Sequence, residues 1–317
     1  NNMCGIVGGI AQRNVIPILI EGLKRLEYRG YDSAGLAVIT DKSIHRQREI
    51  GKVKGLEDLL AADPFSGNIG IAHTRWATHG KPSTQNAHPH ICNNKVAVVH
   101  NGIIENHQVL RETQKAQGYK FTSETDTEVI AHQIYQELES TDSLLQAVKN
   151  TIQRLEGAYA LGVISRDDED TLVTGRKGSP LVIGVGIGEY FIASDVAALL
   201  PVTQRFIFLE DGDVAELKTN SLVIYDKHDQ VVERPVKESS LKAGAVDKGE
   251  YRHYMLKEIY EQPSAIAETL EGRFIDDKLQ DYAFGHNAAE IFDKVKAVQI
   301  LACGTSFHSG LVAEYWF

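Results

Sequence analysis

Cys4 is the residue of this chain whose type and position most favour catalysis. It lies in the segment Met3-Cys4-Gly5-Ile6-Val7-Gly8, and it would become the first residue if the chain began after Met3. A first-residue cysteine carries both a thiol and a free α-amine, which titrate near pH ~8.5 and ~8, so the amine can take the thiol proton. The alternative is a small buried cysteine that opens the first strand, and position alone favours it.

The leader before Cys4 matters chemically. Asn1 and Asn2 precede Met3, and we expect them to be an addition to the natural start. In the chain as written, Cys4 therefore has no free α-amine. We expect amine-assisted chemistry only from a chain that begins at Cys4.

Three further positions carry groups suited to amide chemistry. Asn101-Gly102, at the end of an apolar run, can offer a side-chain amide and a backbone N–H to a developing oxyanion. Arg75 presents a guanidinium fork that fits a carboxylate, and Asp126 suits an ammonium group. The alternatives are a hairpin turn, a surface arginine and a helix-start carboxylate. Local pattern alone favours the hairpin turn.

These residues lie in motifs that occur in a fixed order. The motifs are Cys4-Gly5-Ile6-Val7-Gly8, Leu26-Glu27-Tyr28-Arg29-Gly30-Tyr31-Asp32-Ser33-Ala34-Gly35, His73-Thr74-Arg75-Trp76-Ala77-Thr78-His79-Gly80 and Val99-His100-Asn101-Gly102-Ile103. Together they resemble the class II, or N-terminal-nucleophile, glutamine amidotransferases. The second motif is similar to that of the glucosamine-6-phosphate synthases. The phosphoribosyl-pyrophosphate amidotransferases differ there and are closer to Gln-His-Arg-Gly-Gln-Glu.

The resemblance implies an enzyme that makes glucosamine 6-phosphate and glutamate from fructose 6-phosphate and glutamine, the first step of the route to UDP-N-acetylglucosamine. Cys4 would form a γ-glutamyl thioester, and ammonia would pass internally to the sugar site. No metal or organic cofactor is expected. A second reading is a class II amidotransferase with another phosphorylated acceptor, such as phosphoribosyl pyrophosphate. A third is a binding module without turnover, which the intact catalytic motifs argue against.

The resemblance also assigns roles to residues. It implies that Cys4, Asn101 and Gly102 are catalytic, and that a loop over residues 75–81 closes on glutamine, with Trp76 as a hinge or gate. The glutamine-binding positions implied are Arg29, Arg75, Trp76, Thr78, His79 and Asp126. The sugar-phosphate loop implied is Cys303, Gly304, Thr305 and Ser306, which a helix start would suit because backbone N–H groups converge there.

Apolar periodicity predicts many strands between flanking helices. Helices are expected at residues 15–28, 143–155 and 257–270, the last interrupted at Pro263, and after a capping box at residues 125–128. Strands are expected at residues 4–11, 36–40, 69–72, 96–100, 158–165, 181–186, 190–193, 206–209, 214–217, 222–225 and 295–301.

The expected fold class is α+β, and by resemblance a four-layer αββα sandwich. The expected domains are a glutaminase domain at 4–235, a linker at 236–250 and the incomplete start of a sugar-isomerase (SIS) domain at 251–317. We expect the complete protein to be a homodimer joined through the isomerase domain. Because that domain is incomplete here, this chain could be a monomer.

Composition and local motifs argue against several other classes of function. The 317 residues carry a formal net charge of -10, which argues against general nucleic-acid binding. Three separated cysteines favour a reducing cytoplasm, and no apolar run could span a membrane. His88-Pro89-His90 has no third ligand at a suitable spacing, so we interpret both histidines as structural. Gly184-x-Gly186-x-Gly188 precedes a strand-like run and predicts a hairpin.

Overall fold

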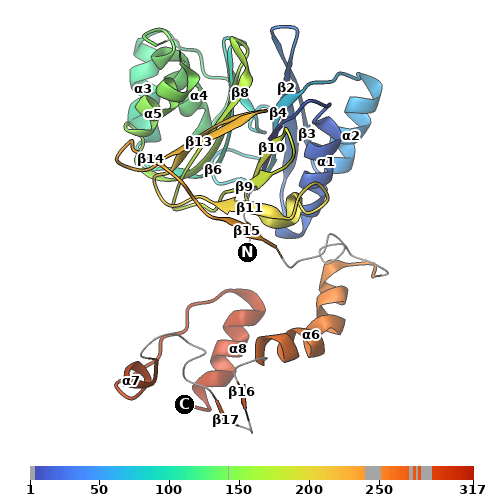
Figure 1. Ribbon diagram of the computed structural model, residues 1–317, viewed down its shortest axis with the longest axis vertical. Coiled ribbons are helices and arrows are strands. Elements are labelled where there is room, and N and C mark those ends of the chain that lie inside the picture. Colours follow the sequence, from blue (N-terminus) through green and yellow to red (C-terminus); the bar gives the residue numbers. More distant parts are fainter. Residues whose placement is uncertain (1–3, 142, 240–250, 271–273, 276–277, 280–287) are drawn as a thin grey trace. The chain divides into compact units, whose positions relative to one another are not determined.

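The computed structural model describes residues 4–141, 143–239, 251–270, 274–275, 278–279 and 288–317. The chain divides into two compact units, with the boundary between residues 247 and 248. The first unit combines two antiparallel sheets with helices (Figure 1). None of the described helices is both long enough and apolar enough to cross a membrane.

The larger sheet holds the strand that follows Cys4. Within the described residues it has eight strands, in the spatial order β15 (Val236–Glu238), β11 (Arg205–Phe208), β9 (Val182–Val185), β10 (Tyr190–Ala193), β1 (Gly5–Ile10), β4 (Ile69–Arg75), β2 (Ser33–Thr40) and β3 (Ser43–Ile50). Strand β1 lies between β10 and β4, and Gly5 pairs with Thr74. Cys4 is thereby placed near the end of β4, whose last residue is Arg75.

The second sheet holds Asn101. Its seven described strands are ordered β14 (Val231–Val232), β13 (Ser221–Tyr225), β12 (Val214–Lys218), β8 (Asp168–Lys177), β7 (Gly157–Ser165), β6 (Val96–Ile104) and β5 (His90–Cys92). Strand β6 pairs with β7 along its whole length, so Asn101 lies opposite Ala160.

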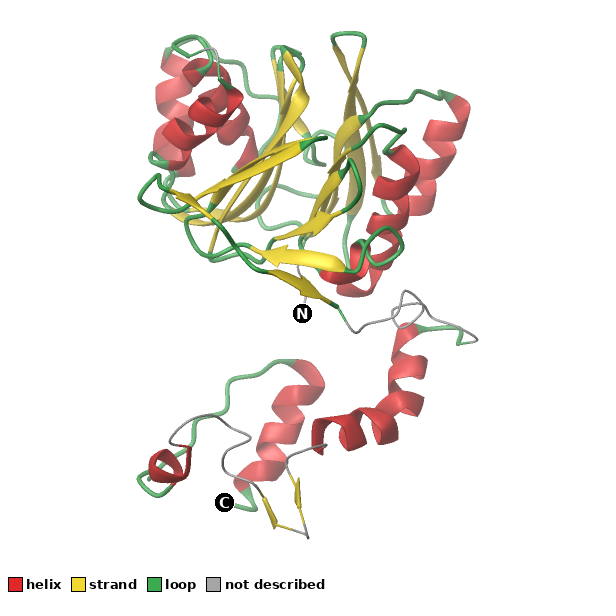
Figure 2. Ribbon diagram, viewed as in Figure 1, coloured by secondary structure: helices red, strands yellow, loops and turns green. Residues whose placement is uncertain are grey.

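Helices cover the outer face of each sheet (Figure 2). Beside the first sheet lie α1 (Ile16–Arg25) and α2 (Val53–Ala62), followed in the chain by α3 (His107–Ala116), α4 (Thr127–Glu137) and α5 (Leu144–Ile152) beside the second. Two single 3₁₀ turns, η1 (Glu27–Arg29) and η2 (Val196–Ala198), complete the unit.

Three buried apolar clusters hold these parts together. One joins α1 and α2 to the first sheet, one fills the space between the sheets, and one joins α4 and α5 to the second sheet. Alternate residues of a strand face opposite sides, so Val7 enters the first cluster and its neighbour Ile6 the second. Each fully buried aliphatic side chain contributes about 1.5–3 kcal/mol.

Most predicted elements of the first unit are present with small shifts at their ends. The Gly184–Gly188 segment is the predicted hairpin, because β9 and β10 pair antiparallel across it. The longer elements that were missed are β3, α2, α3 and β8, and the short strands β5 and β14 were missed as well. Strand β3 and most of α3 are polar or only partly buried, so they carry little periodic apolar signal.

The predicted capping box at residues 125–128 is wrong. Asp126 is the N-cap of α4, but its backbone is helical rather than extended and its side chain makes no capping bond. The Glu128 carboxylate instead accepts the backbone N–H groups of Thr122 (2.8 Å) and Ser123 (2.7 Å). These donors lie in the preceding loop, which folds against the helix start.

The second unit contains α6 (Tyr254–Leu270), β16 (Phe274–Ile275), β17 (Lys278–Leu279), α7 (Ala288–Phe292) and α8 (Gly304–Glu314). Helix α6 continues through Pro263 rather than stopping there, although proline removes one helical hydrogen bond. The buried strand predicted at 295–301 is wrong, since the segment is irregular and Leu301 is 84% exposed. A strand of that type needs paired neighbours and covered faces, and the described residues supply neither.

The predicted linker at 236–250 also differs from the structure at its start. Residues Val236–Glu238 form β15 and extend the first sheet by pairing with β11. The remaining part, 240–250, lies outside the described residues.

Candidate active site

Cys4 and Asn101 meet where the ends of the two sheets approach each other. The Asn101 side-chain nitrogen donates to the Cys4 carbonyl oxygen at 2.9 Å. Cys4 comes directly before β1 in the first sheet, and Asn101 lies on β6 in the second. The two predicted catalytic positions, 97 residues apart in the chain, are therefore adjacent.

The Cys4 thiol is held by the backbone of Trp76. Sγ accepts the Trp76 N–H at 3.1 Å and lies 3.4 Å from the Trp76 carbonyl oxygen. Burial raises the pKa of this thiol, although the Trp76 N–H and the charge of Arg75 oppose that effect. Among the described residues, no titratable side chain forms a hydrogen bond with Sγ. The thiol is thus a weak acid without a side-chain base.

Two cavities meet at Cys4. The larger, about 410 Å³, is lined mainly by apolar atoms and includes Arg29, Asn101 and Ile103 in its wall. The smaller, about 10 Å³, is lined by Arg75, His79 and Asp126. Cys4, Trp76, Thr78 and Gly102 line both cavities.

Asn101-Gly102 is not a hairpin turn. Strand β6 continues to Ile104, and Gly102 lies opposite Tyr159 within the sheet. Gly102 has φ +132°, and a Cβ atom there would lie 2.0 Å from the Ala158 carbonyl oxygen. Only glycine suits this position, so the strand can place its backbone directly against the cavity.

Arg75 is buried and is held by the loop that follows it. One guanidinium nitrogen, Nη2, donates to the carbonyl oxygens of His79 and Gly80, the latter at 2.9 Å. The other, Nη1, makes no hydrogen bond among the described residues and lies 3.5 Å from Asp32. Asp32 also accepts the Ala77 N–H at 2.6 Å, so both Arg75 and its neighbour Asp32 form hydrogen bonds with the loop.

Asp126 faces the same small cavity. One of its oxygens accepts the Ile104 N–H at 2.9 Å, and the other lies 3.9 Å from Nδ1 of His79. The carboxylate sits at the N-terminus of α4, where the helix dipole favours negative charge. The structure therefore brings a cation and an anion, Arg75 and Asp126, into the wall of one cavity.

Arg29 lines the larger cavity, but its guanidinium is already engaged. It bonds Asp195 at 2.6 Å and the Ser194 hydroxyl at 3.1 Å. The Ser194 hydroxyl in turn accepts the N–H of Ile6, two residues after Cys4. These contacts indicate that Arg29 fixes the start of β1.

The predicted sugar-phosphate residues belong to the second unit. Cys303 is the N-cap of α8, and Gly304, Thr305 and Ser306 begin that helix. All four are exposed, and the expected preceding strand is absent from the described residues. Their role stays a prediction.

Sequence reasoning missed two residues that organise the site. Asp32 binds both the loop and Arg75, and His73 bonds Asn101 at 2.9 Å. Both lie inside the quoted motifs. Their contacts depend on pairing between distant strands, so no local signal distinguished them.

The histidines of the 88–90 segment are buried and bonded to threonines. Nε2 of His88 bonds the Thr127 hydroxyl at 2.8 Å, and Nε2 of His90 bonds the Thr125 hydroxyl at 3.0 Å. Burial lowers the pKa of both histidines. In the described part of the chain, no group of three or more His, Cys, Asp or Glu side chains is placed to hold a metal ion.

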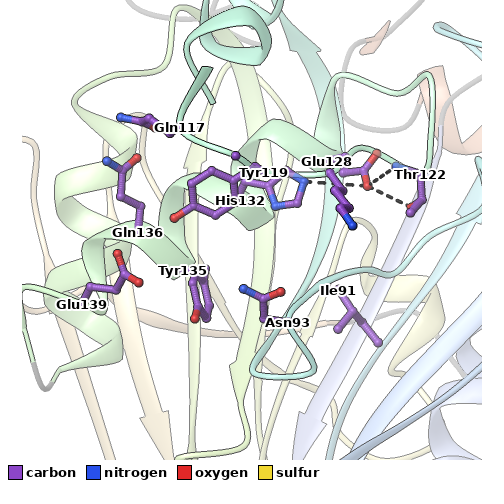
Figure 3. A pocket seen from close by; sticks show the side chains of 12 residues that line it. Ile91, Asn93, Gln117, Tyr119, Thr122, Glu128, His132, Tyr135, Gln136 and Glu139 are labelled. Carbon is purple, nitrogen blue, oxygen red and sulfur yellow. Dashed lines mark hydrogen bonds and ion pairs between the residues drawn. The ribbon is translucent and has the colours of Figure 1, made fainter. Parts of the chain in front are cut away.

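A larger cavity, about 790 Å³, is lined in part by residues of α4 and contains none of the predicted site residues (Figure 3). Tyr119, Tyr135 and His132 lie in its wall. His132 also bonds the buried Cys92, with Nδ1 and Sγ 3.1 Å apart, and burial raises the pKa of that thiol to about 12.

Comparison with known proteins agrees with this geometry. Residues 73–201 match the family model described as a glutamine amidotransferase domain. Over 99% of its length, the chain is 59% identical to a glutamine–fructose-6-phosphate aminotransferase (isomerizing) of Shewanella oneidensis. Identities to proteins of the same name are 58% for Pseudomonas putida and 56% for Vibrio cholerae. The chain spans 52% of each of these relatives, about half their length.

Solved structures show the same fold at lower identity. Glutamine phosphoribosylpyrophosphate amidotransferase of B. subtilis matches 72% of this chain and 50% of its own, with a TM-score of 0.62 and 24% identity. The allosteric regulatory enzyme of purine biosynthesis matches 71% of this chain and 49% of its own, with a TM-score of 0.62 and 26% identity. Together with the catalytic motifs gathered around Cys4, the sequence matches show that the chain carries a glutamine amidotransferase domain.

Proposed function

We propose that residues 4–235 hydrolyse the side-chain amide of glutamine through a thioester on Cys4. The observation that carries this proposal is the position of the Cys4 thiol. It lies between a cavity bordered by Asn101 and Gly102 and a second cavity bordered by Arg75 and Asp126. The thiol can attack the amide, the first cavity can stabilise the oxyanion, and the second can recognise the amino-acid end of the substrate.

A free α-amine on Cys4 is needed to accept the proton of the thiol. The raised pKa of the thiol means that it does not ionise by itself near neutral pH. In a chain beginning at Cys4, the α-amine accepts the thiol proton as sulfur attacks the carboxamide carbon. The same group then returns the proton to the departing nitrogen, which leaves as ammonia, and water later releases glutamate from the thioester.

The oxyanion donors are the Asn101 amide and the Gly102 backbone N–H. The Asn101 NH₂ group has two hydrogens, and one is used by the Cys4 carbonyl oxygen. The other remains for the oxygen that becomes negative when the carboxamide is attacked. Arg75 binds the α-carboxylate of glutamine and Asp126 its α-ammonium.

Glutamine binding requires the loop at residues 75–81 to open. The cavity between Arg75 and Asp126 has room for about one water molecule, which is too little for the amino-acid end of a substrate. The carbonyl oxygens of His79 and Gly80 occupy one guanidinium nitrogen of Arg75, Nη2. We infer that the α-carboxylate replaces these carbonyls, while Trp76, Thr78 and His79 close again over the substrate.

For the complete protein, we propose transfer of the ammonia to fructose 6-phosphate, giving glucosamine 6-phosphate. High identity to the aminotransferases supports this acceptor over phosphoribosyl pyrophosphate, whose amidotransferase shares only 24% identity with the chain. Residues 251–317 are then the start of an isomerase (SIS) domain, with phosphate bound at residues 303–306. We further propose a homodimer of the complete protein and a cytoplasmic location, supported for the latter by the three free cysteines.

We also propose that the first unit is a four-layer αββα sandwich of the N-terminal-nucleophile type. The two sheets, the helices outside them and the alternating apolar clusters support that assignment. The likeness to an amidotransferase structure with a TM-score of 0.62 supports it further.

The test compares two chains, one beginning at Cys4 and one at Asn1, for ammonia and glutamate release from glutamine. Activity is expected only in the Cys4-first chain, and a Cys4→Ser variant of it should release none. Glutamine hydrolysis that is equally fast with Cys4 replaced would refute the proposal. Isotope-labelled glutamine trapped as a thioester on Cys4 would identify the intermediate directly.

A further inference from the structure

His73 is a buried side chain that links the two sheets next to the thiol. It lies on β4 of the first sheet, is 0% exposed, and faces Asn101 on β6 of the second. Nε2 lies 2.9 Å from the Asn101 side-chain oxygen and 3.0 Å from the His100 carbonyl oxygen. Both partners are acceptors, so Nε2 must carry the ring proton.

The opposite ring nitrogen belongs to no hydrogen-bond relay among the described residues. Nδ1 of His73 is buried and makes no hydrogen bond among the described residues. Burial lowers the pKa of His73 to about 3, so the ring is neutral near pH 7. The ring of His88 packs beside it at a centroid distance of 4.1 Å. His73 therefore supplies a fixed hydrogen-bond donor.

This donor decides which way the Asn101 amide points. With the oxygen turned to His73, the NH₂ group turns to the Cys4 carbonyl and leaves one N–H toward the cavity. A flipped amide would set two donors against each other at His73 and two acceptors against each other at Cys4. We propose that His73 is a positioning residue, which holds the Asn101 amide so that an N–H faces the oxyanion during glutamine hydrolysis.

The inference rests on the proposed glutaminase function, and a pair of variants tests it. In His73→Gln, the side-chain nitrogen reaches the position of the histidine Nε2, whereas in His73→Asn it reaches only that of Nδ1. We expect His73→Gln to keep kcat within about threefold, and His73→Asn to lose about tenfold or more with the KM for glutamine changed less than threefold. The Asn101→Ala loss, about 10²–10³, sets the upper limit.

A double-mutant cycle separates positioning from a general structural role. In an Asn101→Ala background, His73→Asn should cause no further loss of kcat, because the amide that it orients is gone. Each variant is made as a Cys4-first chain, and its folded fraction is measured by circular dichroism before the assay. The value of kcat is then calculated per folded chain, so misfolded protein does not lower it.

The outcomes are distinct. Additive losses in the cycle, equal losses for the glutamine and asparagine variants, or a rise in KM with unchanged kcat would each overturn the inference and leave the glutaminase function standing. An inactive Cys4-first parent would instead overturn the proposed function, and this inference with it.

Discussion

Replacing Gly102 with alanine should damage both stability and catalysis, and the structure predicts by how much. An added Cβ lies 2.0 Å from the Ala158 carbonyl oxygen and 3.1 Å from Nε2 of His100. The first contact involves backbone of the paired strand β7, which cannot rotate away. The φ of +132° adds a conformational cost for any residue with a Cβ.

The expected loss has two parts. Positive φ alone costs about 1–2 kcal/mol for alanine. Overpacking against fixed backbone adds about 1–3 kcal/mol. We therefore expect Gly102→Ala to lower the free energy of unfolding by about 3 kcal/mol, or about 6–12 °C in melting temperature. A backbone shift of about 1 Å would also move the Gly102 N–H and reduce kcat about 10²-fold.

Gly118→Ala is the matched control. Gly118 has φ +93° and nothing within 4 Å of an added Cβ, so this variant measures the conformational part alone. Urea unfolding of both variants, followed by circular dichroism, gives the difference, and ammonia release gives kcat. If Gly102→Ala were no less stable than Gly118→Ala, or kept full kcat, the argument from the Ala158 contact would be refuted.

Three further outcomes are expected. Burial lowers the pKa of His73, His88, His90 and His100, so the unfolded chain binds more protons than the folded chain below pH ~6.5. The free energy of unfolding should therefore decrease as the pH is lowered, by up to ~1.4 kcal/mol per pH unit for each histidine, and a urea midpoint that stays constant from pH 7 to 5 would contradict this. Ser143→Ala removes the cap of α5, which accepts the Gln146 N–H, and should cost about 1 kcal/mol in urea unfolding, whereas Ser143→Thr should cost much less. Asp126→Asn keeps an acceptor for Ile104 but loses its charge, so the KM for glutamine should rise about 10-fold or more with kcat nearly unchanged, and an unchanged KM would exclude Asp126 as the ammonium partner.

The sequence by itself determined the chemistry and much of the local structure. Cysteine near the start, arginine, asparagine-glycine and aspartate are residue types whose groups suit amide hydrolysis wherever they meet. Continuous apolar runs located the strands that are buried on both faces, such as β1 and β7, because nearly every side chain there is buried. Strand β3 was missed because its side chains are mostly half-exposed and carry no such pattern.

Only the tertiary structure decided how these residues cooperate. Asn-Gly favours a hairpin turn locally, yet β7 pairs with β6 through Gly102 and keeps the strand extended. The capping-box spacing of residues 125–128 was overridden because the preceding loop brought two N–H groups to Glu128. His73 and Asp32 gained their roles from partners 28 and 45 residues away, across strand pairings and a loop. Hydrogen bonds are set by distance in space, and spacing along the chain does not report distance between sheets.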